Sequence, residues 1–306
     1  MKAAQINSYG DPSVVEINEV EKPTLQEGQV LIEVDAASLN PFDFKVRAGY
    51  MKDHMPLTFP FTMGGDFAGS VTEITPSVTD FAVGDKVYGQ VGGGGAFAEF
   101  AAVKAGNIAK QPENLDVTEA AALPLVGSSA IQALMQHITL QQGQKLFIHG
   151  GAGGIGSIAI QIAKHIGAYV AVTATGEGIE AAKQLGADEV IDWKVNDFSE
   201  MLSGYDAVYD TVGGDDFIKA FAILKQGGTA VSMGGSNDEQ KAKDLGITVI
   251  NQFTKVTTET LNTLTKLVDD GVVTPHVGKV FPLDQTKEAF EALEAGTVGK
   301  VVLKIK

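Results

Sequence analysis

The chain has 306 residues, enough for about two domains. Its 38 acidic and 23 basic residues give a formal charge of −15, which excludes wrapping a nucleic acid because the protein's field repels phosphates. The absence of cysteine excludes disulfides, thiolate nucleophiles and cysteine-ligated zinc. There is no secretory signal and no run of 18 apolar residues, so we expect a cytoplasmic protein without a membrane span.

The first part of the chain, to about residue 118, is expected to be rich in short β-strands. Turn residues separate segments in which apolar and polar side chains alternate. The four glycines at 92–95 have no helix after them, which indicates a hairpin rather than a phosphate loop. Strands are predicted at 29–35, 70–74 and 86–91.

From about residue 118 onward, apolar strands alternate with helical segments, and Thr118 is predicted to cap the first helix. Nearly all-apolar strands that alternate with helices indicate a parallel sheet covered on both faces. Six such strands predict a doubly wound Rossmann dinucleotide-binding domain at 119–254. The predicted strands are 145–149, 169–173, 189–192, 207–210, 229–232 and 247–250, with helices at 157–166 and 179–185.

The segment after residue 254 fits neither the parallel sheet nor a linker. We therefore assign 255–306 to the same domain as 1–118. The expected fold class is α/β: a Rossmann doubly wound sheet plus a β-rich catalytic domain built from both ends of the sequence. The segment is predicted to form a helix at 258–269, a strand at 278–281, a helix at 284–294 and a strand at 299–303.

The clearest motif is the run from His149 to Gly156, His-Gly-Gly-Ala-Gly-Gly-Ile-Gly, which contains G-x-G-x-x-G between an apolar strand and a helix. Gly151 permits a tight turn, Gly153 lets the backbone approach a pyrophosphate, and Gly156 lets the helix pack on the strand. The helix N-terminus supplies amide donors and a partial positive charge. The predicted cofactor residues here are Gly151, Ala152, Gly153, Gly154, Ile155 and Gly156.

The end of the second strand decides between NAD and NADP. An NAD enzyme usually places Asp or Glu there to hold the ribose hydroxyls. Thr173 occupies that position, followed by Ala174 and Thr175, so nothing repels a 2′-phosphate. No arginine or lysine lies between 174 and 178 to hold one, and Glu177 lies close by. We expect NADPH, with NADH as the alternative.

Several motifs together resemble zinc-independent medium-chain dehydrogenases/reductases of the quinone oxidoreductase, or zeta-crystallin-like, family. The resemblance covers essentially the whole chain and implies a GroES-like β domain, a Rossmann domain and a cleft between them. Zinc-dependent relatives carry cysteines near Asn40 and Ser128 and a histidine where Gly65 stands, so we expect no catalytic metal. The motifs are 38–49, 64–69, 81–89, 95–100, 121–127, 149–156 and 185–192.

The resemblance also implies roles for individual residues. Asn40 is the first catalytic candidate because its amide can donate to a developing oxyanion, and Tyr50 could donate a hydrogen bond or a proton. We expect Asp66 to anchor a loop and His149 to be structural, whereas Asp43 and Lys45 alternate with apolar residues as solvated charges. Further cofactor contacts are expected from Ser128, Ser129, Thr211, Val212, Gly213, Met233, Gly234, Gly235, Phe253 and Lys300.

The expected function is NADPH-dependent hydride transfer to a quinone. A quinone or enone accepts hydride directly, so the chemistry needs positioning and hydrogen bonds rather than a Lewis acid. The alternatives are reduction of 2-alkenals, enones or enoyl thioesters, a cofactor-binding protein without turnover, and a zinc alcohol dehydrogenase. The resemblance also implies a homodimer.

Overall fold

The computed structural model describes residues 1–235 and 238–306, which divide into two compact units. Unit 1 comprises Met1–Leu125, Val256–Asp269 and Pro275–Lys306, and unit 2 comprises Val126–Lys255 and Asp270–Thr274. The sequence boundaries at 118/119 and 254/255 lie close to these divisions. The segment 270–274, which we assigned to the first domain, packs with unit 2 instead.

Unit 2 is built on a six-stranded sheet in the order β11-β10-β9-β12-β13-β14, and every neighbouring pair is parallel. The chain starts in the middle of the sheet and winds outward in both directions, which is the doubly wound Rossmann order. The strands are β9 (Lys145–His149), β10 (Tyr169–Ala174), β11 (Glu189–Asp192), β12 (Tyr205–Asp210), β13 (Leu224–Ser232) and β14 (Thr248–Asn251).

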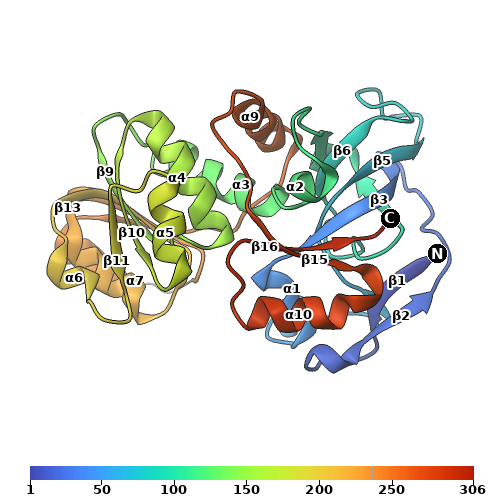
Figure 1. The fold of residues 1–306 in the computed structure, drawn as a ribbon, viewed down its shortest axis with the longest axis horizontal. Helices are drawn as coiled ribbons and strands as arrows, with labels where there is room; N and C mark the ends of the chain where they lie inside the picture. Colours follow the sequence, from blue (N-terminus) through green and yellow to red (C-terminus); the bar gives the residue numbers. More distant parts are fainter. Residues whose placement is uncertain (236–237) are drawn as a thin grey trace. The chain divides into compact units, whose positions relative to one another are not determined.

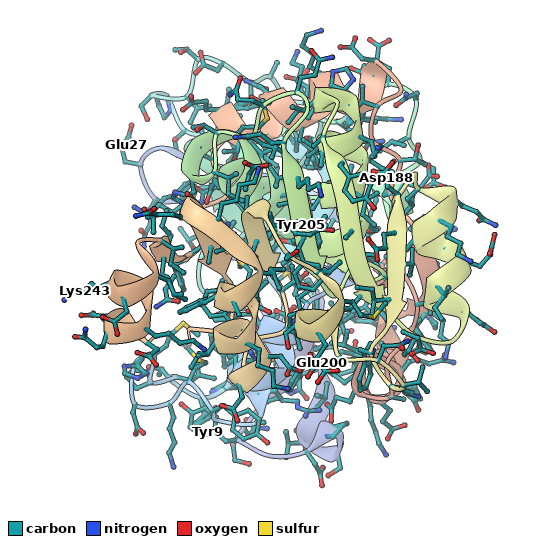
Figure 2. The ribbon with its side chains drawn as sticks, turned by 90° about the vertical axis from the view of Figure 1, so that its left-hand side faces the viewer. Tyr9, Glu27, Asp188, Glu200, Tyr205 and Lys243 are labelled. Carbon is teal, nitrogen blue, oxygen red and sulfur yellow. The ribbon has the colours of Figure 1, made fainter. Side chains whose placement is uncertain are left out.

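Helices cover both faces of this sheet. The helices α4 (Gly154–Ile166) and α5 (Glu177–Gln184) pack on β9, β10 and β11 (Figure 1). Ile158 and Ile162 of α4 are buried. A second cluster of buried apolar side chains, which includes Phe147, Phe198 and Phe217, lies between the sheet and the remaining helices of unit 2. The remaining helices are α6 (Phe198–Met201), α7 (Asp215–Lys219), η4 (Ala220–Ile223) and α8 (Glu239–Leu245). On α8, Lys243 points away from the sheet (Figure 2).

Three short helical segments precede the Rossmann strands: α2 (Val117–Ala121), α3 (Pro124–Ile131) and the π-helical turn η3 (Gln132–His137). The cap of α2 is Asp116 and not Thr118, because the Asp116 carboxylate accepts from the backbone amides of Thr118 and Glu119. Thr118 is already the second residue of the helix.

Unit 1 joins both ends of the sequence in one seven-stranded sheet. Strand β16 runs antiparallel to β3, so the red C-terminal strand lies beside a blue N-terminal one (Figure 1). The order is β15-β16-β3-β5-β6-β8, with β7 also paired to β3, and a smaller sheet has the order β2-β1-β4. The strands are β1 (Lys2–Ile6), β2 (Val15–Glu19), β3 (Gln29–Leu39), β4 (Phe61–Thr62), β5 (Asp66–Ile74), β6 (Lys86–Gln90), β7 (Phe100–Lys104), β8 (Ile108–Lys110), β15 (Val277–Pro282) and β16 (Lys300–Lys304).

The helical segments of unit 1 pack around these sheets. The predicted helix at 258–269 is confirmed as α9. The glycine run 92–95 is not a hairpin, because it joins β6 to β7 and these two strands pair with other partners. The segments are η1 (Pro12–Val14), α1 (Pro41–Arg47), η2 (Ala105–Asn107), α9 (Thr258–Asp269), η5 (Leu283–Gln285) and α10 (Thr286–Glu294).

Helix α1 corrects the expectation of solvated charges after Asn40. Pro41 occupies the first helical position, where its fixed φ suits a helix, and the period of 3.6 turns Asp43 and Arg47 inward while Lys45 stays exposed. Arg47 is 1% exposed, pairs with Glu294 at 2.8 Å and lies over the Phe290 ring.

Candidate active site

The glycine turn between β9 and α4 has two glycines that the packing requires. A Cβ on Gly151 would lie 2.6 Å from the Val172 side chain, and one on Gly156 would lie 2.2 Å from the Gly150 carbonyl oxygen. Both distances are too short for a real side chain. The close helix packing expected at Gly156 agrees with this geometry, whereas Gly151 is required by its close approach to Val172 on β10.

Gly153 differs, because the fold leaves room for a side chain there. Its Cβ would meet only the Gly150 carbonyl oxygen, at an ordinary 3.4 Å, and the residue is exposed. Gly153 also caps α4, and no side chain of the described residues caps that helix. The first amides of α4 are therefore available to an anion, with the positive end of the helix dipole behind them. The turn fits the diphosphate of a dinucleotide.

Thr173 holds the glycine turn through a hydrogen bond. It is 1% exposed, and its hydroxyl accepts a hydrogen bond from the backbone amide of Gly150 at 2.9 Å. Strand β10 continues through the buried Ala174, and the half-exposed Thr175 follows. The side chain at the open end of β10 is therefore that of Thr175, and neither residue after Thr173 is acidic.

Asp210, at the carboxyl end of β12, organises the neighbouring loops, a role that we did not predict from the sequence. Its carboxylate lies 2.9 Å from His149 Nδ1 and accepts from the Ser232 hydroxyl at 2.7 Å and from the Gly213 amide at 3.0 Å. Burial raises the pKa of Asp210, but the hydrogen bonds from His149, Ser232 and Gly213 outweigh burial and hold the pKa below its ordinary value. An aspartate between an apolar strand and two glycines is the sequence signal for such a loop anchor.

The other expected cofactor residues of unit 2 lie at strand ends or on α3. Val212 and Phe253 are 61% and 77% exposed, which leaves their side chains open to a ligand. The Thr211 hydroxyl donates to the His149 carbonyl, and Gly234 N donates to the Ser232 hydroxyl. Ser128 and Ser129 are buried on α3, and the hydroxyls of Ser129 and Thr254 lie 2.7 Å apart. Met233 and Gly235 belong to the loop after β13.

In unit 1, Asn40 belongs to a buried polar cluster, defined as Asn40, Asp43, Asp66 and Lys300. Asn40 Nδ2 donates to Asp66 at 2.9 Å, and Asn40 Oδ1 accepts from Lys300 Nζ at 2.5 Å. The Asp43 carboxylate accepts from the Asn40 backbone amide at 2.7 Å. Asp66 also accepts from Gln90 and from the backbone amide of Leu125, which confirms its expected role as a loop anchor.

Burial dominates the electrostatics of this cluster. It raises the pKa of Asp43 to about 7 and also raises the pKa of Asp66, although Lys300 opposes the shift of both carboxyl groups. Burial lowers the pKa of Lys300, against the attraction of Asp66 and Asp43. Two acids and one base therefore share a site with little water, where each charge depends on its partners.

Tyr50 lies outside the cluster. It follows α1, its side chain is 73% exposed, and its backbone amide donates to the Lys45 carbonyl. Among the described residues, no group of three or more histidine, cysteine, aspartate or glutamate side chains could hold a metal. Asp66 already accepts three hydrogen bonds from groups of the protein.

The sequence matches two families, the alcohol dehydrogenase GroES-like domain over residues 26–113 and the zinc-binding dehydrogenase over residues 185–303. It is 36% identical to 2-methylene-furan-3-one reductase of Solanum lycopersicum and 35% identical to the chloroplastic NADPH-dependent alkenal/one oxidoreductase of Arabidopsis thaliana. Each alignment covers 99% of this chain and 79% of the relative. The structure of the quinone oxidoreductase from Coxiella burnetii is similar at a TM-score of 0.92 and 34% identity, over 100% of this chain and 99% of that one.

Unit 1 is thus a GroES-like domain, unit 2 a Rossmann domain, and the protein an oxidoreductase. The chain belongs to the quinone oxidoreductase family of the medium-chain dehydrogenases/reductases, as its motifs indicated. In residues 1–235 and 238–306, no helix is both long and apolar enough to cross a membrane.

Proposed function

We propose that the protein reduces quinones with NADPH. The observation that carries this proposal is the turn at Gly153, where the fold leaves space for a side chain and the first amides of α4 have no side-chain cap. A ligand with a diphosphate explains why glycine stands there. Similarity to an NADPH-dependent enzyme and to a quinone oxidoreductase supports the choice of both reactants.

In the proposed reaction, unit 2 binds the cofactor, and residues of unit 1 contact the acceptor. NADPH, when bound, supplies a hydride. The turn from Gly151 to Gly156 holds its diphosphate, and the loops after β12 and β13 hold the rest of the cofactor. Asn40 donates a hydrogen bond to the oxyanion that forms on the acceptor, and Tyr50 contacts the substrate. An activated acceptor needs no Lewis acid, so we propose that the reaction proceeds without zinc.

Reduction of an α,β-unsaturated carbonyl is the second candidate. It is favoured by the two relatives whose names specify a furanone and an alkenal or enone. Asn40 would act on the enolate oxygen as it does on the quinone oxygen. Enoyl-thioester reduction uses the same hydride but needs an elongated channel, and a binding protein without turnover would need only unit 2.

The test is oxidation of NADPH, and separately of NADH, with a panel of ortho- and para-quinones and short enones. Turnover of quinones with a preference for NADPH is the expected result. Preference for enones would move the assignment to alkenal reduction, and preference for NADH would overturn the cofactor assignment. Tight NADPH binding without turnover of any acceptor would contradict the enzymatic proposal.

We further propose that the protein is a homodimer in the cytoplasm. The absence of cysteine from the sequence is consistent with a reducing compartment. Light scattering during size-exclusion chromatography tests the dimer, since a mass of one chain would contradict it.

A further inference from the structure

The oxygen and the nitrogen of the Asn40 carboxamide form hydrogen bonds with groups of opposite charge. A lysine ammonium can only donate hydrogen bonds, and an ionised carboxylate can only accept them. Lys300 must therefore face Asn40 Oδ1 and Asp66 must face Asn40 Nδ2, as observed. Turning the amide over would place donor against donor and acceptor against acceptor. One orientation of the carboxamide is therefore enforced.

The sheet brings these three residues together. Strands β16 and β5 flank β3 on its two sides, and their first residues are Lys300 and Asp66. In the register, Leu39 pairs with Val301 on one side, and Ser38 pairs with Asp66 on the other. Asn40 follows directly after β3, so both charged partners lie next to its side chain.

The Lys300 ammonium already donates to acceptors within its own unit. It is 7% exposed, and its ammonium donates to the Leu39 carbonyl oxygen at 2.8 Å as well as to Asn40. Moving its ammonium to another ligand would leave Asp66, which is fully buried, without its cation. The second N–H of Asn40 Nδ2 has no acceptor among the residues that the structure describes. It is the free donor that an oxyanion needs.

We infer that Lys300 is a positioning residue for Asn40, not a ligand of the cofactor phosphates. This inference rests on the proposed function, in which Asn40 donates to the oxyanion of the reduced acceptor. Lys300 fixes the carboxamide so that Nδ2 carries the donors. Its charge on Oδ1 also draws electron density from the amide, which makes the free N–H a stronger donor. The resemblance implied a phosphate contact for Lys300, and the hydrogen bonds to Leu39 and Asn40 replace that role.

The test compares Lys300→Met, Asn40→Ala and the double variant with the wild type. Lys300→Met should lower kcat with quinones by at least about tenfold, with the Kd for NADPH changed by less than about twofold. The double variant should be no slower than Asn40→Ala alone, because Lys300 acts through Asn40. Lys304→Met, an exposed position on the same strand, is the matched control and should match the wild type.

Two results would overturn the inference. One is a Kd for NADPH that rises by at least about tenfold in Lys300→Met with kcat unchanged, which is the signature of a cofactor ligand. The other is independent, multiplying losses of kcat in the double variant. Because Lys300→Met leaves two buried acids without a cation, Lys300→Met/Asp43→Asn also removes one of these acids. With the acids ionised, the net charge of the cluster is then the same as in the wild type, and this variant is used if the single one does not fold.

A measurement that needs no turnover separates this inference from the proposed function. The side-chain amide resonances of Asn40 are assigned by their loss in Asn40→Ala. They should shift in Lys300→Met and stay in place in Lys304→Met. Unmoved resonances in Lys300→Met would overturn the positioning role. Shifted resonances in a protein that reduces neither quinones nor enones would leave the contact established and refute only the proposed reaction.

Discussion

The backbone amide of Gly150 donates to the Thr173 hydroxyl at 2.9 Å, which ties the end of β10 to the glycine turn. We expected Thr173 at the ribose, where its lack of charge would admit a 2′-phosphate. In the structure Thr173 is buried, and its hydroxyl accepts a hydrogen bond within the protein. Thr173 therefore helps to hold the glycine turn.

Replacement of Thr173 by Val should destabilise unit 2 while keeping its shape. The partly buried Gly150 amide would lose its acceptor, which costs about 1 kcal/mol of unfolding free energy. Urea unfolding of the variant measures this cost, and the Kd for NADPH should rise because the turn loosens. Thr173→Ser keeps the hydroxyl and should stay close to the wild type. Equal stability of Thr173→Val and wild type would contradict the role assigned to this bond.

Gly153→Val should abolish cofactor binding without unfolding the protein. The added Cβ meets only the Gly150 carbonyl oxygen at an ordinary distance, but the side chain occupies the space in front of the α4 amides. We expect the Kd for NADPH, measured by fluorescence titration, to rise about 100-fold or more. Gly156→Ala is the matched control, because its Cβ would lie 2.2 Å from the same oxygen and should lower the melting temperature. Unchanged NADPH affinity in Gly153→Val would refute the assignment of this turn.

Asn40→Ala should lower turnover far more than cofactor affinity. If Asn40 donates to the oxyanion, its loss should reduce kcat by about 100-fold. The glycine turn that we propose binds NADPH lies in unit 2, so the Kd for NADPH should change little. Steady-state kinetics and fluorescence titration provide the two measurements. A kcat equal to that of the wild type would remove Asn40 from the mechanism.

Asp43→Asn should change how stability depends on pH. Burial raises the pKa of Asp43 in the folded protein to about 7, above the value of about 3.9 in an unfolded chain. Between these values the folded state holds a proton that the unfolded state has lost, so the unfolding free energy decreases as pH rises, by at most about 1.4 kcal/mol per pH unit. Melting temperatures measured across about pH 4 to 8 should fall less steeply in Asp43→Asn than in the wild type.

The exposed Asp53→Asn should keep the wild-type pH profile. Asp66 and Lys300 share the buried site with Asp43, so some dependence on pH should persist in Asp43→Asn. Parallel profiles for Asp43→Asn and the wild type would show that the proton is held elsewhere.

Local patterns predicted most of the regular elements. The strand Glu189–Asp192 and the helix Thr258–Asp269 have the predicted bounds, because each has a clear period of apolar residues and turn residues at its ends. Helix α1 was missed because Phe42 and Phe44 alternate with charged residues over only seven positions, which imitates a strand. A segment this short is governed by Pro41 at its start and by tertiary packing of Val46 and Arg47.

The site was predictable where it is local in sequence. The glycine turn is one continuous motif, and its geometry requires glycine at two of the three positions that the sequence singled out. The pairing of Asn40 with Lys300 joins residues 260 positions apart and depends on β16 pairing with β3, which no local pattern reports. Asp43 and Asp210 were missed as site residues for the same reason, since their partners lie on other elements.

The position of β16 has a consequence for synthesis on the ribosome. The six strands of the unit 2 sheet lie between residues 145 and 251, so all of them are translated before Lys300. In the unit 1 sheet, in contrast, β3 pairs with β16, which is translated more than two hundred residues after β3. A nascent chain can therefore complete its Rossmann sheet while Asn40 and Asp66 still lack their cation, and the polar cluster is one of the last parts of the protein to form.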